Sequence, residues 1–152
     1  MINQKSTKEQ VLEAVRQNVD ELDYASEDLR NDREVVLEAV KQDGYGLRYA
    51  SEDLKNDREV VLEAVKQDGR ALGFASEALK ADREVVLEAV KYHGHSLAED
   101  ALPLECANKK LKSDPQFMLQ AVKHNGYVLM WANASLLYDI GQQWVQNMEE
   151  KK

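Results

Sequence analysis

Apolar residues recur along this chain with the period of an α-helix, in segments of about ten residues. In residues 32–41 five apolar side chains occupy most of the helix surface, and Glu34, Glu38 and Lys41 form a narrow polar stripe. A helix with so narrow a polar stripe is covered by neighbours on two sides. No run shows the period-two alternation that is typical of a strand. The pattern predicts an all-α fold of short packed helices.

This helical segment is repeated. The string Asp-Arg-Glu-Val-Val-Leu-Glu-Ala-Val-Lys occurs at 32–41, 57–66 and 82–91, and weaker copies begin at Thr7 and Asp114. Units of this size bury their apolar faces only by stacking on one another. We therefore expect an all-α, short right-handed α-solenoid of five 25-residue helical repeats with a C-terminal capping helix. The expected parts are a flexible N-terminus (1–6), units 7–31, 32–56, 57–81, 82–113 (with an insertion at 99–105) and 114–138, and a capping helix and tail (139–152).

Both ends of the first helix in each unit carry a signal. An aspartate stands where its side chain can cap the helix, and Pro115 follows one of these aspartates at the first helical position, where its missing N–H costs nothing. Twelve residues after each aspartate comes a glycine, which we expect to be left-handed and to close the helix. The aspartates are Asp32, Asp57, Asp82 and Asp114, and the glycines are Gly44, Gly69, Gly94 and Gly126.

The second half of a unit is one helix or two short ones, and we favour two because Ser51 can start a new helix. Equivalent apolar residues should form two buried ladders through the stack. The first contains Leu22, Leu47, Leu72, Leu97 and Leu129, and the second contains Tyr24, Tyr49, Phe74, Cys106 and Trp131.

The two ends of the chain depart from the repeat. Gln10 stands where the inner units have valine, which is consistent with a terminal unit that faces water. At the other end Asp139 is expected to cap a helix with Ile140, Trp144, Val145 and Met148 on one face. Phe117, Met118, Met130, Trp131, Trp144 and Met148 are expected to form a terminal core; the alternative is a docking or dimer patch.

Residues 32–56, Asp-Arg-Glu-Val-Val-Leu-Glu-Ala-Val-Lys-Gln-Asp-Gly-Tyr-Gly-Leu-Arg-Tyr-Ala-Ser-Glu-Asp-Leu-Lys-Asn, resemble the tandem repeat family called domain of unknown function 4116. The resemblance covers about residues 7–138. It implies a repeat protein of the kind found in intracellular bacteria and some protists, including candidate secreted effectors, and it carries over no catalytic residue. The insertion, and Ala134-Ser135 in place of Glu-Asp, depart from the family pattern.

Charge and composition argue against several classes of function and location. The formal net charge is −8, and residues 1–107 carry 14 bases against 24 acids. Nucleic acid is therefore not an expected partner, because its phosphates are bound by lysine and arginine. The apolar runs are too short to span a membrane, and residues 1–6 lack the apolar core of a signal peptide. With a single cysteine, these features favour a cytoplasmic protein, or one exported to a host cell without a classical signal peptide.

The residues that could carry chemistry do not form a recognisable motif. His93, His95 and Cys106 lack the paired spacing of a zinc site, and Cys106 stands at an expected core position rather than in an electropositive cleft. Adjacent acids such as Glu52-Asp53 recur with the repeat, which is typical of helix caps and solvated faces. We expect no catalytic residue, no metal and no cofactor.

Differences between the units mark the expected binding surface. Equivalent positions in stacked units form one stripe, so variation on a constant frame can encode recognition, and insertions commonly lie on the binding face. The alternative is variation of exposed loops without function. The candidate partner-binding residues are Tyr45, Arg48, Arg70, His95, Glu99, Asp100, Leu102, Tyr127 and Met130.

These observations favour a non-enzymatic protein–protein interaction scaffold, a monomer or weak dimer whose acidic charge favours a basic protein as partner. The alternative is a regulatory or substrate-docking module of a larger effector enzyme. A third possibility is a thiol or zinc enzyme that uses Cys106.

Overall fold

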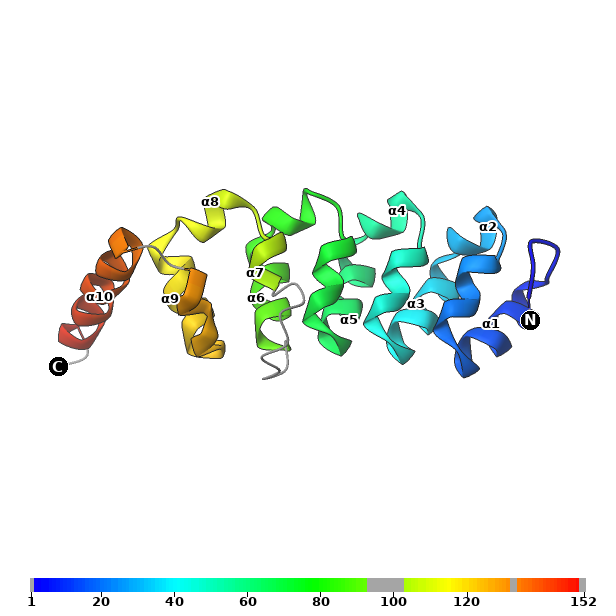
Figure 1. Ribbon diagram of the computed structural model, residues 1–152, viewed down its shortest axis with the longest axis horizontal. Helices are drawn as coiled ribbons and strands as arrows, with labels where there is room; N and C mark the ends of the chain where they lie inside the picture. The colour runs from blue at the N-terminus through cyan, green and yellow to red at the C-terminus, as the bar shows by residue number, and fades with distance from the viewer. Residues whose placement is uncertain (1, 93–102, 132–133, 151–152) are drawn as a thin grey trace.

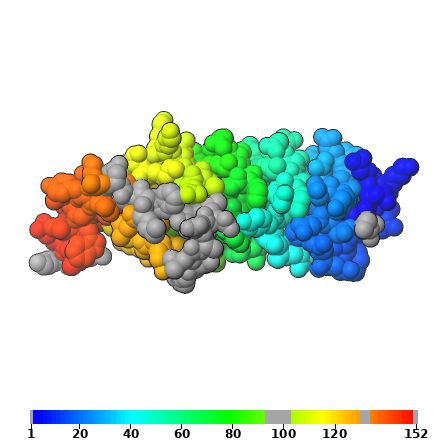
Figure 2. Space-filling view, viewed as in Figure 1, coloured from blue at the N-terminus to red at the C-terminus, as the bar shows by residue number. Residues whose placement is uncertain are grey.

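All regular secondary structure in the described residues of the computed structural model, 2–92, 103–131 and 134–150, is helical, which confirms the all-α prediction. The first helices of successive units stand side by side in a row that runs from the N-terminus to the last helix (Figure 1). The space-filling view shows the same order along an elongated body (Figure 2). The row consists of α1 (Lys8–Gln17), α3 (Arg33–Gln42), α5 (Arg58–Gln67), α6 (Arg83–Lys91) and α9 (Pro115–His124).

In each of the first three units the second half forms two short helices, as favoured. A six-residue 3-10 helix comes first and a shorter helical turn follows it; Ser51 caps α4 by accepting a hydrogen bond from the Leu54 N–H (3.3 Å). The six-residue 3-10 helices are η1 (Val19–Tyr24), η2 (Gly44–Tyr49), η3 (Gly69–Phe74) and η5 (Gly126–Trp131). The following turns are α2 (Glu27–Arg30), α4 (Glu52–Lys55), η4 (Leu79–Ala81) and α8 (Lys109–Lys112), and α7 (Pro103–Cys106) precedes α8.

The predicted aspartate caps are confirmed. Asp57 accepts hydrogen bonds from the backbone N–H groups of Glu59 (2.9 Å) and Val60 (3.1 Å), which have no partner inside the helix. Asp32, Asp82 and Asp114 cap their helices in the same way, and Pro115 is the first residue of α9.

The predicted role of the glycines is wrong. Asp43 ends α3 with extended backbone, and Gly44 begins η2 without left-handed geometry. A Cβ on Gly44 would lie 2.4 Å from the carbonyl oxygen of Ala64 in the next unit, so glycine is needed for close packing between units. Gly69 and Gly126 also begin 3-10 helices, and Gly94 lies outside the described residues.

A ladder of ion pairs joins the first helices. The cation at the first position of each helix binds the capping aspartate of the next unit: Lys8 to Asp32 (2.7 Å), Arg33 to Asp57 (3.1 Å), Arg58 to Asp82 (3.1 Å) and Arg83 to Asp114 (2.7 Å). The first three cations also pair with Glu34, Glu59 and Glu84. Exposed ion pairs stabilise a fold only modestly, so we assign this ladder to the register of stacking rather than to overall stability.

A second ladder uses backbone hydrogen bonds between the short turns. The Ser51 N–H donates to the Arg30 carbonyl (3.0 Å), and the Ser76 N–H donates to the Lys55 carbonyl (3.0 Å). The Asn108 N–H donates to the Lys80 carbonyl (2.9 Å), although the unit that contains Asn108 carries the extra residues. The register of the short turns is therefore the same on both sides of the predicted insertion.

The leucine ladder is largely confirmed. Leu22, Leu47 and Leu72 are fully buried, whereas Leu129 is 40% exposed and its prediction is wrong. Leu129 belongs to η5, which in the described residues is followed by α10 rather than by another copy of the unit. Leu97 lies outside the described residues, and the buried Leu104 precedes Cys106 by two residues as Leu47 precedes Tyr49.

The described side chains of the second predicted ladder are not fully buried. Tyr24 is 56% exposed, so its predicted burial is wrong. Tyr49, Phe74 and Cys106 are half-buried, and the side chain of Trp131 lies outside the description.

The first unit shows the exposed position that is expected of a terminal unit. Gln10 is exposed, whereas Val35, its equivalent in the next unit, is fully buried. Residues 2–6, expected to be flexible, include a turn, and Ile2 packs in the core with its N–H donating to Glu21 (3.0 Å).

The last helix differs from the prediction. Helix α10 spans Ala134–Glu149, so Asp139 lies inside the helix and does not cap it. Ile140 is buried, but Trp144 (55%), Val145 (47%) and Met148 (51%) are exposed. The expected terminal core therefore keeps Phe117 and Met118, both fully buried, and loses Trp144 and Met148. No helix in the described ranges is long and apolar enough to cross a membrane.

Candidate functional site

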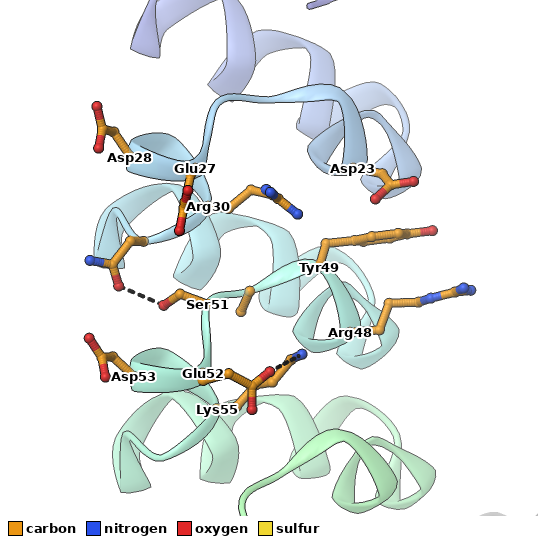
Figure 3. Close-up of a pocket in the computed structure, with 12 residues that line it drawn as sticks. Asp23, Glu27, Asp28, Arg30, Arg48, Tyr49, Ser51, Glu52, Asp53 and Lys55 are labelled. Atoms are coloured by element: carbon orange, nitrogen blue, oxygen red, sulfur yellow. Dashed lines mark hydrogen bonds and ion pairs between the residues drawn. The ribbon is translucent and has the colours of Figure 1, made fainter. Parts of the chain in front are cut away.

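A groove of about 540 Å³ lies between the second halves of the first two units (Figure 3). One wall comes from η1 and η2, and the other comes from α2, α4 and the segments that precede them. The lining residues are Asp23, Glu27, Asp28, Arg30, Asn31, Arg48, Tyr49, Ala50, Ser51, Glu52, Asp53 and Lys55.

All the acidic side chains of the groove except Asp23, which lies in η1, come from the first turns of α2 and α4. Ser26 and Ser51 cap these turns, and acids at positions one and two of a helix are favoured by the helix dipole. Glu52 pairs with Lys55 (2.9 Å). In the part of the chain that the structure describes, Asp23, Glu27, Asp28 and Asp53 form no ion pair, so four unpaired carboxylates border the groove beside its bases Arg30, Arg48 and Lys55.

The Arg30 side chain extends from α2 into the groove. Its guanidinium is directed toward the side on which Tyr49 and Asp23 lie (Figure 3). Its Nε atom is the one buried side-chain nitrogen or oxygen, of those described, that has no hydrogen-bond partner. A buried donor without an acceptor costs about 1 to 3 kcal/mol, so this arginine is a candidate ligand-binding group.

Tyr49 closes the opposite wall and is tied to the first unit. Its hydroxyl donates to Asp20 (2.6 Å), and the Arg48 guanidinium lies 5.0 Å from the centre of its ring. The hydrogen bond to Asp20, with burial as a second cause, raises the pKa of Tyr49 to about 12. Tyr49 therefore remains a neutral donor at physiological pH, and its ring is held in a fixed place beside the groove.

A second cluster crosses the boundary between the second and third units. The Arg70 guanidinium lies 5.1 Å from the centre of the Tyr45 ring, and the Tyr45 and Phe74 rings meet edge to face with centroids 5.3 Å apart. Asp68 pairs with Arg70 (2.6 Å). Tyr45 and Arg70, which sequence variation marked as one stripe, are thus in contact.

The remaining predicted binding residues are not brought to these clusters by the described structure. His95, Glu99, Asp100 and Leu102 lie outside the described residues. Tyr127 is exposed on η5 of the fifth unit, and Met130 belongs to the same 3-10 helix, with its side chain outside the description.

Sequence reasoning missed Arg30, Glu27 and Tyr49 as groove residues. One signal could have identified Arg30, because it is an arginine at the position where the next two units have Lys55 and Lys80. Tyr49 was assigned to a core ladder because it is aromatic and recurs with the unit.

The environment of Cys106 disfavours its thiolate form. Burial raises the pKa of its half-buried thiol, and the thiolate is the reactive form. Within the described residues no group of three or more histidines, cysteines or acids is arranged to hold a metal ion. His93 and His95 lie outside those residues.

Comparison with known proteins gives one family. The family model described as Domain of unknown function (DUF4116) matches residues 7–55, 57–103 and 82–137, and the second and third matches overlap. Together these matches span most of the chain. No curated protein and no solved structure matches the chain.

Proposed function

The chain belongs to the family described as Domain of unknown function (DUF4116), and from this premise we propose that it is a non-enzymatic protein–protein interaction module. The binding surface of the proposed module comprises the groove between the first two units and the adjoining Tyr45–Arg70–Phe74 cluster.

The scaffold we propose for this module is a right-handed solenoid of five 25-residue units closed by α10. The two inter-unit ladders support it, because each repeats the same contact from one unit to the next. The residues at its ends support it too. Thr7 replaces the capping aspartate in the first unit, and Pro115 replaces the pairing cation in the last.

The observation that carries the proposal is the groove bordered by four carboxylates without ion-pair partners. A concave surface of this size suits a few residues of a partner rather than a flat contact between domains. Tyrosine and arginine, which form the adjoining cluster, are common among residues that dominate binding energy in protein interfaces.

Charge indicates the class of partner. The net charge of −8, concentrated in residues 1–107, attracts a protein with a basic surface and speeds their encounter. We propose that this encounter takes place in the cytoplasm, either of the cell that makes the protein or of a host cell that receives it.

The proposal is tested by partner capture. The immobilised protein is exposed to a cell extract, captured proteins are identified, and the affinity of the purified partner is measured. We expect Asp28→Asn with Asp53→Asn to weaken this affinity by about tenfold, because two exposed charges at an interface contribute roughly that much.

A matched control removes the same charge elsewhere. Asp139→Asn with Glu149→Gln neutralises two exposed acids on α10. Equal weakening by both double variants would mean that only net charge matters, and full affinity of the groove variant would place the interface on another surface.

A further inference from the structure

Arg30 differs from its equivalents in the next two units. The Lys55 and Lys80 ammonium groups each pair with a glutamate three residues earlier, at 2.9 Å in both cases. Glu27 stands at that position relative to Arg30, yet in the described structure no ion pair or side-chain hydrogen bond engages the Arg30 guanidinium. In the described residues Arg30 is therefore a groove cation without an ion pair, whereas Lys55 and Lys80 at the equivalent positions are paired.

The surroundings of Arg30 restrict the group that it can bind. Its guanidinium can donate several hydrogen bonds in one plane and accepts none. Asp23, Glu27 and Asp28 line the same groove and form no ion pair in the described residues. The acids of the groove outnumber its bases, Arg30, Arg48 and Lys55, by five to three, so the groove repels an incoming carboxylate or phosphate. A neutral oxygen acceptor, such as a main-chain carbonyl, is not repelled.

The same carboxylates favour a cationic ligand. Together with Asp53 they can each pair with a lysine or arginine side chain. A ligand that satisfies both requirements carries several cations along a backbone of amide carbonyls. A polyamine has the cations without the carbonyls, and an acidic peptide has the carbonyls with the wrong charge.

We propose that this groove binds an extended, lysine- or arginine-rich peptide segment, with a main-chain carbonyl of the peptide accepting hydrogen bonds from the Arg30 guanidinium. The inference rests on the proposed interaction function and adds the chemistry of the ligand.

The test uses hexalysine, acetylated and amidated at its ends, as the probe. The Nε–Hε group of an arginine gives its own nitrogen–proton resonance, so binding at Arg30 is observed directly by NMR, with assignment from the Arg30→Gln spectrum. We expect hexalysine to shift this resonance. Spermine, which is cationic but has no carbonyl, should shift resonances of groove residues and leave the Arg30 resonance in place.

The affinity of Arg30→Gln for hexalysine distinguishes simple charge attraction from the proposed hydrogen bonds. Simple charge attraction predicts tighter binding of hexalysine, since the substitution removes a positive charge from the groove. The proposed hydrogen bonds predict weaker binding instead, by about tenfold to a hundredfold, as for the loss of charge-assisted hydrogen bonds. Lys80→Gln, which removes a cation at the equivalent position two units away, should leave the affinity within about twofold.

Unchanged or tighter binding to Arg30→Gln, or an Arg30 resonance that does not move with hexalysine, overturns the inference. The proposed function is judged separately, by capture of a partner that depends on Asp28 and Asp53. A partner that requires these acids but binds Arg30→Gln normally would leave the interaction function in place and remove this account of its ligand.

Discussion

At the scale of single residues, the hydrogen bond from Tyr49 to Asp20 links the first two units beside the groove. The carboxylate holds the phenolic proton and raises the pKa of Tyr49 from 10.0 to about 12. We predict that Asp20→Asn lowers this pKa toward its ordinary value, because the amide carries no charge, while burial continues to raise it. Titration of tyrosinate absorbance measures the change, and Tyr49→Phe identifies the signal among six tyrosines. A late-titrating tyrosine that persists in Asp20→Asn would contradict the assignment.

The capping aspartates make stability depend on pH. Burial alone would raise the pKa of Asp57, but the Val60 N–H, the Arg33 guanidinium and the Glu59 N–H outweigh burial and hold this pKa below its usual value. A carboxyl with a lowered pKa in the folded state stabilises the fold above its unfolded pKa of about 4, and this contribution is lost as pH falls through the folded pKa.

We predict that Asp57→Asn reduces the loss of stability between about pH 5 and about pH 2, because asparagine also caps helices but does not titrate in this range. Asp57→Ala should cost about 1 kcal/mol more than Asp57→Asn near neutral pH, because it also removes the cap. Urea unfolding at a series of pH values measures both effects. Identical pH profiles for the wild type and Asp57→Asn would show that this carboxylate does not contribute.

At the scale of elements, Gly44, which begins η2, sets how closely the second and third units approach. We predict that Gly44→Ala destabilises the protein by about 1 to 3 kcal/mol, because its Cβ would lie 2.4 Å from the Ala64 carbonyl oxygen. Gly126→Ala is the matched control, since no atom lies within 4 Å of its added Cβ. It should stabilise the protein by about 0.4 to 1 kcal/mol. Equal effects of the two substitutions in urea titrations would show that the close approach does not matter.

The same glycine shows where prediction from sequence succeeds and fails. The sequence correctly predicted the aspartate caps, Pro115 at the start of α9 and the new helix that begins after Ser51. These features depend on backbone groups two or three residues away, so a local pattern was enough to predict them. The role of Gly44 depends on Ala64, which is 20 residues away in the next unit, and the spacing alone suggested an ordinary helix end. Leu129 was misassigned for a related reason, because burial of an equivalent position requires a following unit.

The candidate site was predictable only in part. Comparison of equivalent positions identified Tyr45, Arg48 and Arg70, because repeat-specific residues stand out against a constant frame. The groove required the structure, since it is formed by two units together and its acids recur as ordinary first-turn residues. Arg30 stands out only when its missing ion pair is compared with those of Lys55 and Lys80.

At the scale of the whole molecule, the uneven charge predicts how binding responds to salt. The affinity for a basic partner should fall as salt rises from about 0.1 M to about 1 M, because the screening length shortens from roughly 10 Å to roughly 3 Å. Titrations of the purified partner at several salt concentrations measure this. The thermal midpoint of the free protein is the control, since the exposed ladder of ion pairs contributes modestly to stability. An affinity that does not change with salt would indicate an apolar interface in place of the acidic groove.

The most direct test of the account is the footprint of the purified partner on the protein. With a mass of 17.3 kDa, the chain is suited to residue-by-residue NMR mapping of backbone resonances. The account predicts that the largest shifts fall in η1, η2, η3, α2 and α4, around Tyr49 and the Tyr45–Arg70 contact, with small changes in the first helices of the units. A footprint centred on the ion-pair ladder with Glu34, Glu59 and Glu84, or on the exposed face of α10, would contradict it.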